Sequence, residues 1–458
     1  MNVLLTHGYF IQDDPKEQKI MRPYPPLGLL YVSAWLEKHG YYNEVFDSTF
    51  SSFDTLKGRL LQSPPDVLAI YTNLMTKLNV LKIIELVRSN EVLKSTKIVL
   101  GGPEVRNHKE NFLRSGADVL VLGEGEETML ELVKCYDQNK GIEGVQSIAY
   151  LKGDGVVETP ERMLMKDLDE LPLPNRAKID MQAYFSAWKN KHGESAISIN
   201  TMRGCPYTCK WCSRAVYGLS YRRRSPKHVV DEIEAIQRDY EVDSAWFVDD
   251  VFTVSHKWLQ GFVEELESKN VMLPFECITR ADRMNEEVIQ LLKRAGCFRV
   301  WIGAESGSQR IIDKMDRRVD VQKVREMIIK AQEAGIQAGT FIMLGYPGET
   351  EEDIEETVNH LKTSNPDYFT ITVAYPIKGT DLYTEVEADF TQTLDWSEST
   401  DRDIDFKRTY SRRYYDFAVR YIVNEVNSQK ASLKGDYLWQ LKSKAKASAA
   451  KLAMNIYR

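Results

Sequence analysis

Short apolar segments alternate with amphipathic segments twice along this chain of 458 residues, and this alternation limits its fold more than any other feature. In the first series the expected strands are 2–6, 44–47, 66–72, 97–101 and 118–122. The expected helices of that series are 27–39, 54–62, 77–90, 108–115 and 126–137. Short apolar strands separated by helices form parallel sheets that are covered on both faces. The sequence therefore predicts a doubly wound, flavodoxin- or Rossmann-like α/β domain over residues 1–150.

The residues that follow these strands are suited to a ligand. In doubly wound folds the ligand lies beyond the carboxyl ends of the strands. The candidate residues there are Thr6, Tyr71, Thr72, Asn73, Gly101, Gly102, Pro103, Glu104, Gly123 and Glu124. Glycine lets a ligand approach the backbone closely, although a single glycine is equally typical of a turn. Because several strand ends on one edge carry such residues, we interpret them as one binding site.

A second series follows a proline-containing segment, 151–195, which we expect to be a linker. The strands of this series are expected at 196–201, 243–249, 274–279, 297–303, 338–344 and 368–374. Its helices are expected at 225–239, 255–269, 284–295, 320–334 and 350–362. Six such units are too few to close a barrel of eight strands. We therefore expect a partial (β/α)6 barrel over 196–385, with a mouth wide enough for a large substrate.

The last stretch, 386–458, shows no strand alternation and is expected to be a helical region. Residues 410–426 are rich in Tyr and Arg at helical spacing, and the tail from Lys430 to Lys451 is rich in lysine. For this tail we favour a solvated amphipathic helix over a specific anion-binding face.

The composition excludes some settings. A hydrophobic content of 43% and a charged content of 28% are typical of a soluble globular protein. The net charge of −7 disfavours nucleic acid as a partner, because phosphate binding dominates such affinity. The N-terminus reads as a strand without a basic segment, and no apolar run approaches the roughly 20 residues that span a bilayer. We therefore expect a cytoplasmic protein without a membrane span.

Three cysteines, Cys205, Cys209 and Cys212, form the run Cys-x3-Cys-x2-Cys. Thiolates are the usual ligands of iron–sulfur clusters, and a 4Fe-4S cluster normally takes four of them. Three thiolates leave one iron open for a substrate or cofactor. A zinc site would need a fourth ligand, and no Cys or His follows at a suitable spacing. A disulfide framework would need an even count in a short secreted chain. The run therefore predicts a 4Fe-4S cluster, whereas Cys135, Cys277 and Cys297 read as ordinary buried residues.

The motifs together resemble the radical S-adenosylmethionine (SAM) enzymes that have an N-terminal cobalamin-binding domain, a branch that includes anaerobic magnesium-protoporphyrin ester cyclase and many radical methylases. The resemblance covers about residues 1–385. Its marks, besides the cysteines, are the runs 24–29, 99–103 and 123–126. It implies three cofactors: the 4Fe-4S cluster, SAM bound to the open iron, and cobalamin. It also implies reductive cleavage of SAM to a 5′-deoxyadenosyl radical, with electrons from an external flavodoxin- or ferredoxin-type reductant.

The resemblance also implies roles for residues of the second series. Trp211 would lie near the adenine and the cluster, and the acidic turn of Asp249 and Asp250 would accept hydrogen bonds from the methionine amino group. Arg280 suits the SAM carboxylate, and Glu305 suits the ribose hydroxyls. The remaining candidates, which lie at the ends of the fourth, fifth and sixth strands, are Ser306, Gly345, Tyr346, Pro347 and Tyr375.

One departure concerns cobalamin. Many cobalamin domains carry Asp-x-His-x-x-Gly, whose histidine ligates cobalt, and this chain has no such run. His7 and His108 are the only histidines at candidate strand ends, and neither lies in that motif. A degenerate domain that holds no corrin therefore stays an alternative.

Four functions are compatible with these features. The first is methylation of an unactivated carbon of a small-molecule or natural-product substrate, with the chemistry carried by the cofactors. The second is a radical cyclisation, rearrangement or oxidation without methyl transfer. A transfer-RNA methylthiolating enzyme is disfavoured because the N-terminal domain has only Cys135 and the tail reads as helical. A sensor with a purely structural cluster is disfavoured by the set of cofactor motifs. The sequence indicates neither the substrate, nor a general base, nor an oligomeric state.

Overall fold

The N-terminal part of the computed structural model, which describes residues 1–458, is built around a sheet of seven strands. The sheet has the order β2-β1-β3-β4-β5-β6-β7. Its strands are β1 (Val3–His7), β2 (Glu44–Phe46), β3 (Val67–Tyr71), β4 (Lys97–Gly101), β5 (Val119–Val121), β6 (Ile148–Lys152) and β7 (Gly155–Glu158). The pairs among β1 to β5 are parallel, as the sequence predicts.

Helices cover both faces of this sheet, and the alternation of side chains along each strand supplies two separate cores. Val3 and Leu5 of β1 pack in the core under α2 (Leu27–Lys38) and α6 (Glu126–Asp137). Leu4 of β1 points to the opposite core. That core lies under α3 (Phe53–Gln62), α4 (Lys77–Ser89) and α5 (Lys109–Arg114). The domain is therefore doubly wound.

The hairpin of β6 and β7 was not predicted, and it crosses residue 150, where the linker was expected to begin. The two strands pair with each other in antiparallel fashion, and β6 pairs with β5 in the same way. Gly153 and Asp154 form its turn, and Gly153 has a φ of +61°. Gly-Asp between two short strand-like runs is a known hairpin signal, so the sequence did contain this feature.

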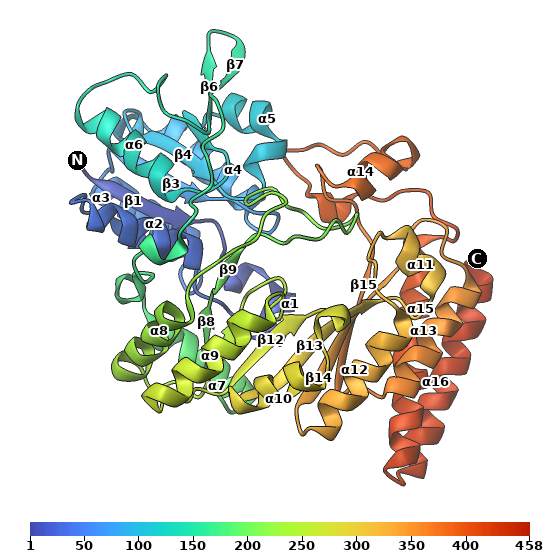
Figure 1. The fold of residues 1–458 in the computed structure, drawn as a ribbon. Coiled ribbons are helices and arrows are strands. Elements are labelled where there is room, and N and C mark those ends of the chain that lie inside the picture. Colours follow the sequence, from blue (N-terminus) through green and yellow to red (C-terminus); the bar gives the residue numbers. More distant parts are fainter.

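The second sheet is the predicted open barrel of six parallel strands, in the order β15-β14-β13-β12-β11-β8 (Figure 1). Its strands are β8 (Ala196–Ile199), β11 (Ser244–Phe247), β12 (Phe275–Thr279), β13 (Cys297–Glu305), β14 (Gln337–Leu344) and β15 (Tyr368–Val373). Its outer helices are α8 (Pro226–Asp239), α9 (His256–Lys269), α10 (Glu286–Arg294), α12 (Val321–Glu333) and α13 (Glu351–Ser364). The edge strands β8 and β15 do not pair with each other, so the barrel stays open.

Several helices lie outside the predicted pattern. The short ones are α1 (Pro15–Ile20), α7 (Met181–His192), α11 (Gln309–Lys314) and α14 (Asp381–Val386). Of these, α7 lies inside the segment predicted as a linker, and Gly193 ends it in the left-handed conformation. The segment 151–195 therefore contains a helix whose Tyr184 and Trp188 are buried.

The C-terminal region is a helical hairpin of α15 (Arg412–Leu433) and α16 (Tyr437–Ile456), drawn in red beside the barrel in Figure 1. The helical prediction is confirmed. In the lysine-rich tail, α16 is amphipathic: Ala447, Ala450 and Met454 pack in the barrel core, whereas Lys442, Lys444 and Lys446 are exposed. The preceding helix α15 packs in the same core through Tyr414, Tyr415 and Ile422.

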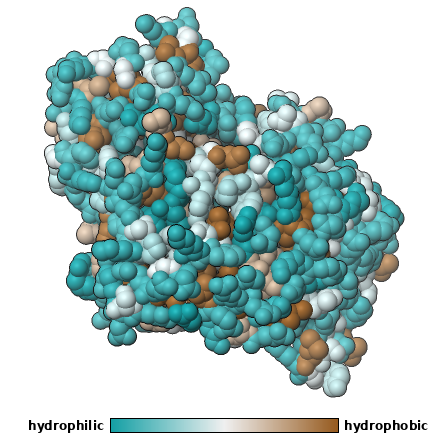
Figure 2. Space-filling view, in the orientation of Figure 1, coloured by the Kyte–Doolittle hydropathy of each residue, from teal (hydrophilic) through white to brown (hydrophobic).

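The surface of the molecule is mostly hydrophilic on the face shown in Figure 2. White and brown residues gather near the centre of that face, between the N-terminal part and the barrel. No helix combines the length and the apolar character that crossing a membrane requires.

Candidate cofactor site between the two sheets

The three cysteines lie in a loop that a short ribbon closes at its base. Strand β9 (Met202–Arg203) pairs in antiparallel fashion with β10 (Arg222–Arg223), so residues 204–221 leave the barrel and return to it. Gly204 begins the loop with a φ of +83°, and a Cβ there would lie 2.6 Å from the carbonyl oxygen of Ser220. Only glycine fits this position without a shift of the backbone. The Cys-x3-Cys-x2-Cys run is therefore presented from a fixed base.

Two buried arginines surround the middle cysteine. Nη1 of Arg280 and Nη1 of Arg317 each lie 3.7 Å from Sγ of Cys209. Guanidinium donors stabilise a thiolate, and hydrogen bonds to sulfur tune the potential of an iron–sulfur cluster. This donor set fits a cluster held by three thiolates.

The thiols themselves are poor acids in this environment. Burial raises the pKa of Cys212 to about 12, and the neighbouring carboxylate of Asp250 adds to that shift. Burial also raises the pKa of Cys205. These thiols are therefore neutral at pH 7 without a metal, and iron would have to displace their protons.

Asp249 and Arg280, two of the residues predicted to bind SAM, are already occupied by protein partners. One carboxylate oxygen of buried Asp249 accepts from the backbone N–H groups of Thr201 (2.7 Å) and Met202 (3.2 Å), and the other is bonded to the Thr201 hydroxyl. Arg280 donates to Asp282 (2.8 Å) and to the carbonyl oxygen of Arg317 (2.7 Å), as well as to Cys209. In this structure Asp249 holds the start of the cysteine loop, and Arg280 braces its middle. Of the acidic pair, only Asp250 is exposed.

Glu305 stands out among the remaining candidates. It has a φ of +64°, which is unusual for a residue with a side chain, at a register shift between β13 and β14. Burial raises the pKa of its carboxyl, and Arg317 lies 3.7 Å away. Strain of this kind concentrates at functional sites. The adjacent Ser306 instead fixes the turn, since its Oγ accepts from the N–H of Ser308 at 3.1 Å.

Trp211 and Tyr346 are brought together by the fold. Both belong to one apolar cluster with Met315, in which Tyr346 is fully buried. Gly345 precedes it with a φ of +74°, and its N–H donates to Glu349 at 2.6 Å. Pro347 follows in the same half-buried turn. Tyr375 lies apart from this cluster, with the Arg402 guanidinium 6.0 Å from its ring.

The N-terminal sheet has a largely apolar cavity of about 260 Å³ at the carboxyl ends of its strands. Six of the ten candidates line it: Tyr71, Gly101, Gly102, Pro103, Gly123 and Glu124. Val216 and Tyr217 of the cysteine loop line the same cavity from the barrel side. This cavity fits a flat, mostly apolar part of cobalamin.

The other four candidates do not line this cavity. The hydroxyls of Thr6 and Thr72 are buried and donate to carbonyl oxygens of the same sheet, at 2.8 and 3.5 Å. The side chain of Asn73 accepts from the backbone at the start of α4. Glu104 lies in a separate buried group with His108. Sequence position at a strand end could not show which side chains turn away from the ligand.

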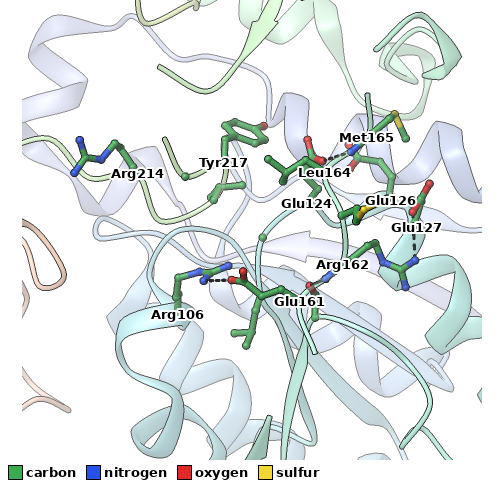
Figure 3. A pocket seen from close by; sticks show the side chains of 16 residues that line it. Arg106, Glu124, Glu126, Glu127, Glu161, Arg162, Leu164, Met165, Arg214 and Tyr217 are labelled. Carbon is green, nitrogen blue, oxygen red and sulfur yellow. Dashed lines mark hydrogen bonds and ion pairs between the residues drawn. The ribbon is translucent and has the colours of Figure 1, made fainter. Parts of the chain in front are cut away.

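Charged pairs join the cavity edge to the cysteine loop. Arg203, which is buried, donates to Glu124 at 3.0 Å and also pairs with Glu126. Arg222 donates to Glu124 as well, at 2.9 Å. Figure 3 shows the pocket beside this seam, where Glu124 accepts from the N–H of Met165 (3.1 Å). Glu124 is therefore a link between the two halves as well as a lining residue.

The sequence did not reveal that Arg317 contacts Cys209 or that Val216 lines the apolar cavity. Arg317 lies in a loop after α11 rather than at a strand end, so no positional pattern marked it. Val216 lies only four residues after Cys212, and that closeness to the cysteines was the one signal available.

Neither histidine considered as a cobalt ligand lines the apolar cavity. Nε2 of His7 pairs with Asp47 at 2.9 Å, and the hydroxyl of Ser48 lies 3.1 Å from its Nδ1.

Comparison with known proteins assigns both halves. The family described as the radical SAM superfamily matches residues 199–361, and the B12 binding domain matches residues 19–133. An uncharacterized methyltransferase of Pyrococcus horikoshii is 27% identical over 384 residues, 82% of each chain. Anaerobic magnesium-protoporphyrin IX monomethyl ester cyclase of Rubrivivax gelatinosus is 28% identical over 84% of this chain and 70% of that one.

The fold agrees with these matches. The cobalamin-dependent SAM radical enzyme OxsB with aqua-cobalamin bound superposes with a TM-score of 0.76 at 15% identity, over 99% of this chain and 80% of that one. The chain is a radical SAM enzyme with a cobalamin-binding domain. Its cofactors are a 4Fe-4S cluster, SAM and cobalamin, so the alternative of a domain without corrin is set aside.

Proposed function

We propose that this enzyme methylates an unactivated carbon of a small-molecule or natural-product substrate. The observation that carries the proposal is the shared cysteine loop. The loop presents Cys205, Cys209 and Cys212 on one side, and its Val216 and Tyr217 line the cavity of the B12 domain on the other. A substrate in the barrel mouth would therefore lie near both cofactors.

The residues divide the work as follows. We infer that the three cysteines hold the cluster, and that Trp211, Asp250, Glu305 and the turn of Gly345 to Pro347 bind SAM. Tyr71, Gly101, Gly102 and Gly123 surround the cobalamin. When bound, these cofactors supply a carbon radical and a methyl group. The protein orients them, excludes water and, through Arg280 and Arg317, stabilises the thiolate of Cys209.

A second candidate is a radical cyclisation or oxidation without methyl transfer. The similarity to the ester cyclase over 84% of this chain favours it. Both candidates require a one-electron reductant of flavodoxin or ferredoxin type, and we place the enzyme in the cytoplasm, where such reductants and reduced thiols occur.

Product analysis separates the two candidates. The holoenzyme, reduced with dithionite, is incubated with SAM carrying a deuterated methyl group and with a small-molecule extract. Methylation predicts 5′-deoxyadenosine together with S-adenosylhomocysteine, and a product that carries the deuterated methyl group. Deoxyadenosine without S-adenosylhomocysteine would refute methylation and support the second candidate. The Cys209→Ala variant is the control and should form neither deoxyadenosine nor labelled product.

A further inference from the structure

Glu104, His108 and Asp401 form a buried group outside the cofactor sites. Each is at least 93% buried. Nε2 of His108 lies 3.6 Å from Oε1 of Glu104 and 4.0 Å from Oδ1 of Asp401. One potential ligand atom from each residue lies within 4.8 Å of the other two. Three side chains of metal-binding type therefore converge on one point.

Polar atoms in this group lack partners. Neither ring nitrogen of His108 makes a hydrogen bond, and Oε1 of Glu104 makes none. No lysine or arginine nitrogen lies within 4.0 Å of either carboxylate. The nearby ammonium group of Lys77 is directed instead to the carbonyl oxygen of Trp396, at 2.8 Å. Unpaired buried groups of this kind are costly in free energy, so a bound cation would stabilise the arrangement.

Burial and neighbouring charges shift the pKa values of two of these groups. Burial, followed by the charge of Asp401, raises the pKa of Glu104 to about 7. Burial, followed by the charges of Lys378 and Lys77, lowers the pKa of His108 to about 3.

We propose that Glu104, His108 and Asp401 bind one divalent transition-metal ion, of the Zn²⁺ type, that is separate from the cluster and from cobalamin. An imidazole nitrogen with two carboxylate oxygens is a zinc-type donor set, whereas Mg²⁺ and Ca²⁺ prefer oxygen alone. Tetrahedral ligands on zinc lie about 3.3–3.6 Å apart. The two distances from His108 are 3.6 and 4.0 Å, and the two carboxylate oxygens lie within 4.8 Å of each other, so the three side chains would have to draw together around the ion. A neighbouring cavity of about 650 Å³, lined by His108 and Asp401, supplies an entry path and room for a water ligand.

The ion would join two parts of the chain. Glu104 and His108 follow β4 in the cobalamin-binding domain, whereas Asp401 belongs to the segment 387–405 that follows α14. Figure 1 shows this orange segment next to α5. Oδ2 of Asp401 accepts from the N–H of Lys378 at 2.7 Å, and Asn107 donates to the carbonyl oxygen of Lys378 at 2.7 Å. The ion would therefore fasten the segment 387–405 to the cobalamin-binding domain.

Zinc uptake by the full-length chain tests the proposal. The 4Fe-4S cluster is first reconstituted, so that iron occupies the cysteines, and the protein is then dialysed against Zn²⁺. Metal analysis should find one zinc per chain in the native protein and in His39→Gln, a control at an exposed histidine. His108→Gln and Asp401→Asn should lose zinc affinity at least ten-fold, with the iron content unchanged. X-ray absorption at the zinc edge should show nitrogen and oxygen ligands without sulfur.

Three results would overturn the proposal: no zinc in the native protein, equal zinc in His108→Gln, or sulfur ligands at the zinc edge, which would place the ion on cysteines. Thermal unfolding separates lost binding from lost folding. Without zinc, Asp401→Asn should melt no lower than the native protein, because it removes one of two buried like charges. Zinc should raise the melting temperature of the native protein and leave that of Asp401→Asn unchanged.

Discussion

The ion pair between Arg203 and Glu126 provides the sharpest test of how the two halves are held together. Arg203 is 4% exposed and Glu126 is 5% exposed at their side chains, and Glu124 is a second partner at 3.0 Å. Removing one member of a buried pair leaves an uncompensated charge and typically destabilises a protein by about 3–5 kcal/mol. We expect Arg203→Met to lower the free energy of unfolding by that amount, because Glu126 has no other cation within 4.0 Å.

The assay is urea unfolding of the full-length chain, followed by circular dichroism, with iron retention measured on the same samples. The control is Arg106→Met at the same seam, whose pair with Glu161 is solvent-exposed on the glutamate side and should contribute about 0–1 kcal/mol. The double variant Arg203→Met/Glu126→Leu removes both charges together. It should be more stable than the sum of the single changes predicts, by about 2 kcal/mol.

Iron retention adds a second readout, because Arg203 directly precedes Gly204 and Cys205. We expect Arg203→Met to lose cluster iron faster than Arg106→Met does. A cost below about 1 kcal/mol for Arg203→Met, or strictly additive single changes, would refute the reasoning that this buried pair fixes the base of the cysteine loop.

Three further predictions follow from single sites. Cys209→Ala should abolish the iron–sulfur absorbance after reconstitution, whereas Cys135→Ala should retain it; equal iron in both variants would contradict the cluster assignment. Burial raises the pKa of Glu349 from 4.5 to about 8 in the folded state. The stability that this difference contributes is fully present below about pH 4.5 and is lost as the pH rises through 8. Glu349→Gln should therefore flatten the fall of melting temperature between about pH 5 and pH 8. An unchanged slope would show that Glu349 does not cause this fall. Gly101 has room for a side chain on the wall of the apolar cavity, so Gly101→Leu should lower the cobalt content after reconstitution and leave the iron content unchanged.

Much of the fold could be predicted because its strands are short, apolar and separated by amphipathic helices. The eleven parallel strands of the two sheets and the open barrel followed from that periodicity. The hairpin of β6 and β7 was missed although its Gly-Asp turn is visible in the sequence, because the alternation of strands and helices that defines the parallel sheet does not extend to an antiparallel hairpin. Helix α7 was missed because the prolines around 160–174 suggested an irregular linker throughout.

The site could be predicted only in part. The cysteines and the glycines of the cavity depend on local spacing, which the sequence displays. The partners of Asp249 and Arg280 come from segments that only the tertiary fold brings close, so their role as braces was not visible. Arg317 was missed for the same reason, since it reaches Cys209 from more than one hundred positions along the chain.

The loop of residues 204–221 has a consequence for how the holoenzyme is assembled. The same short segment carries the three cysteines and, through Val216 and Tyr217, forms one wall of the apolar cavity that we assign to cobalamin. Filling either site would restrict the loop that the other site also uses, so we expect the two cofactors to be loaded interdependently rather than as separate modules. A chain that has lost its cluster should exchange its corrin faster. Oxygen damage to the cluster would then be followed by loss of cobalamin.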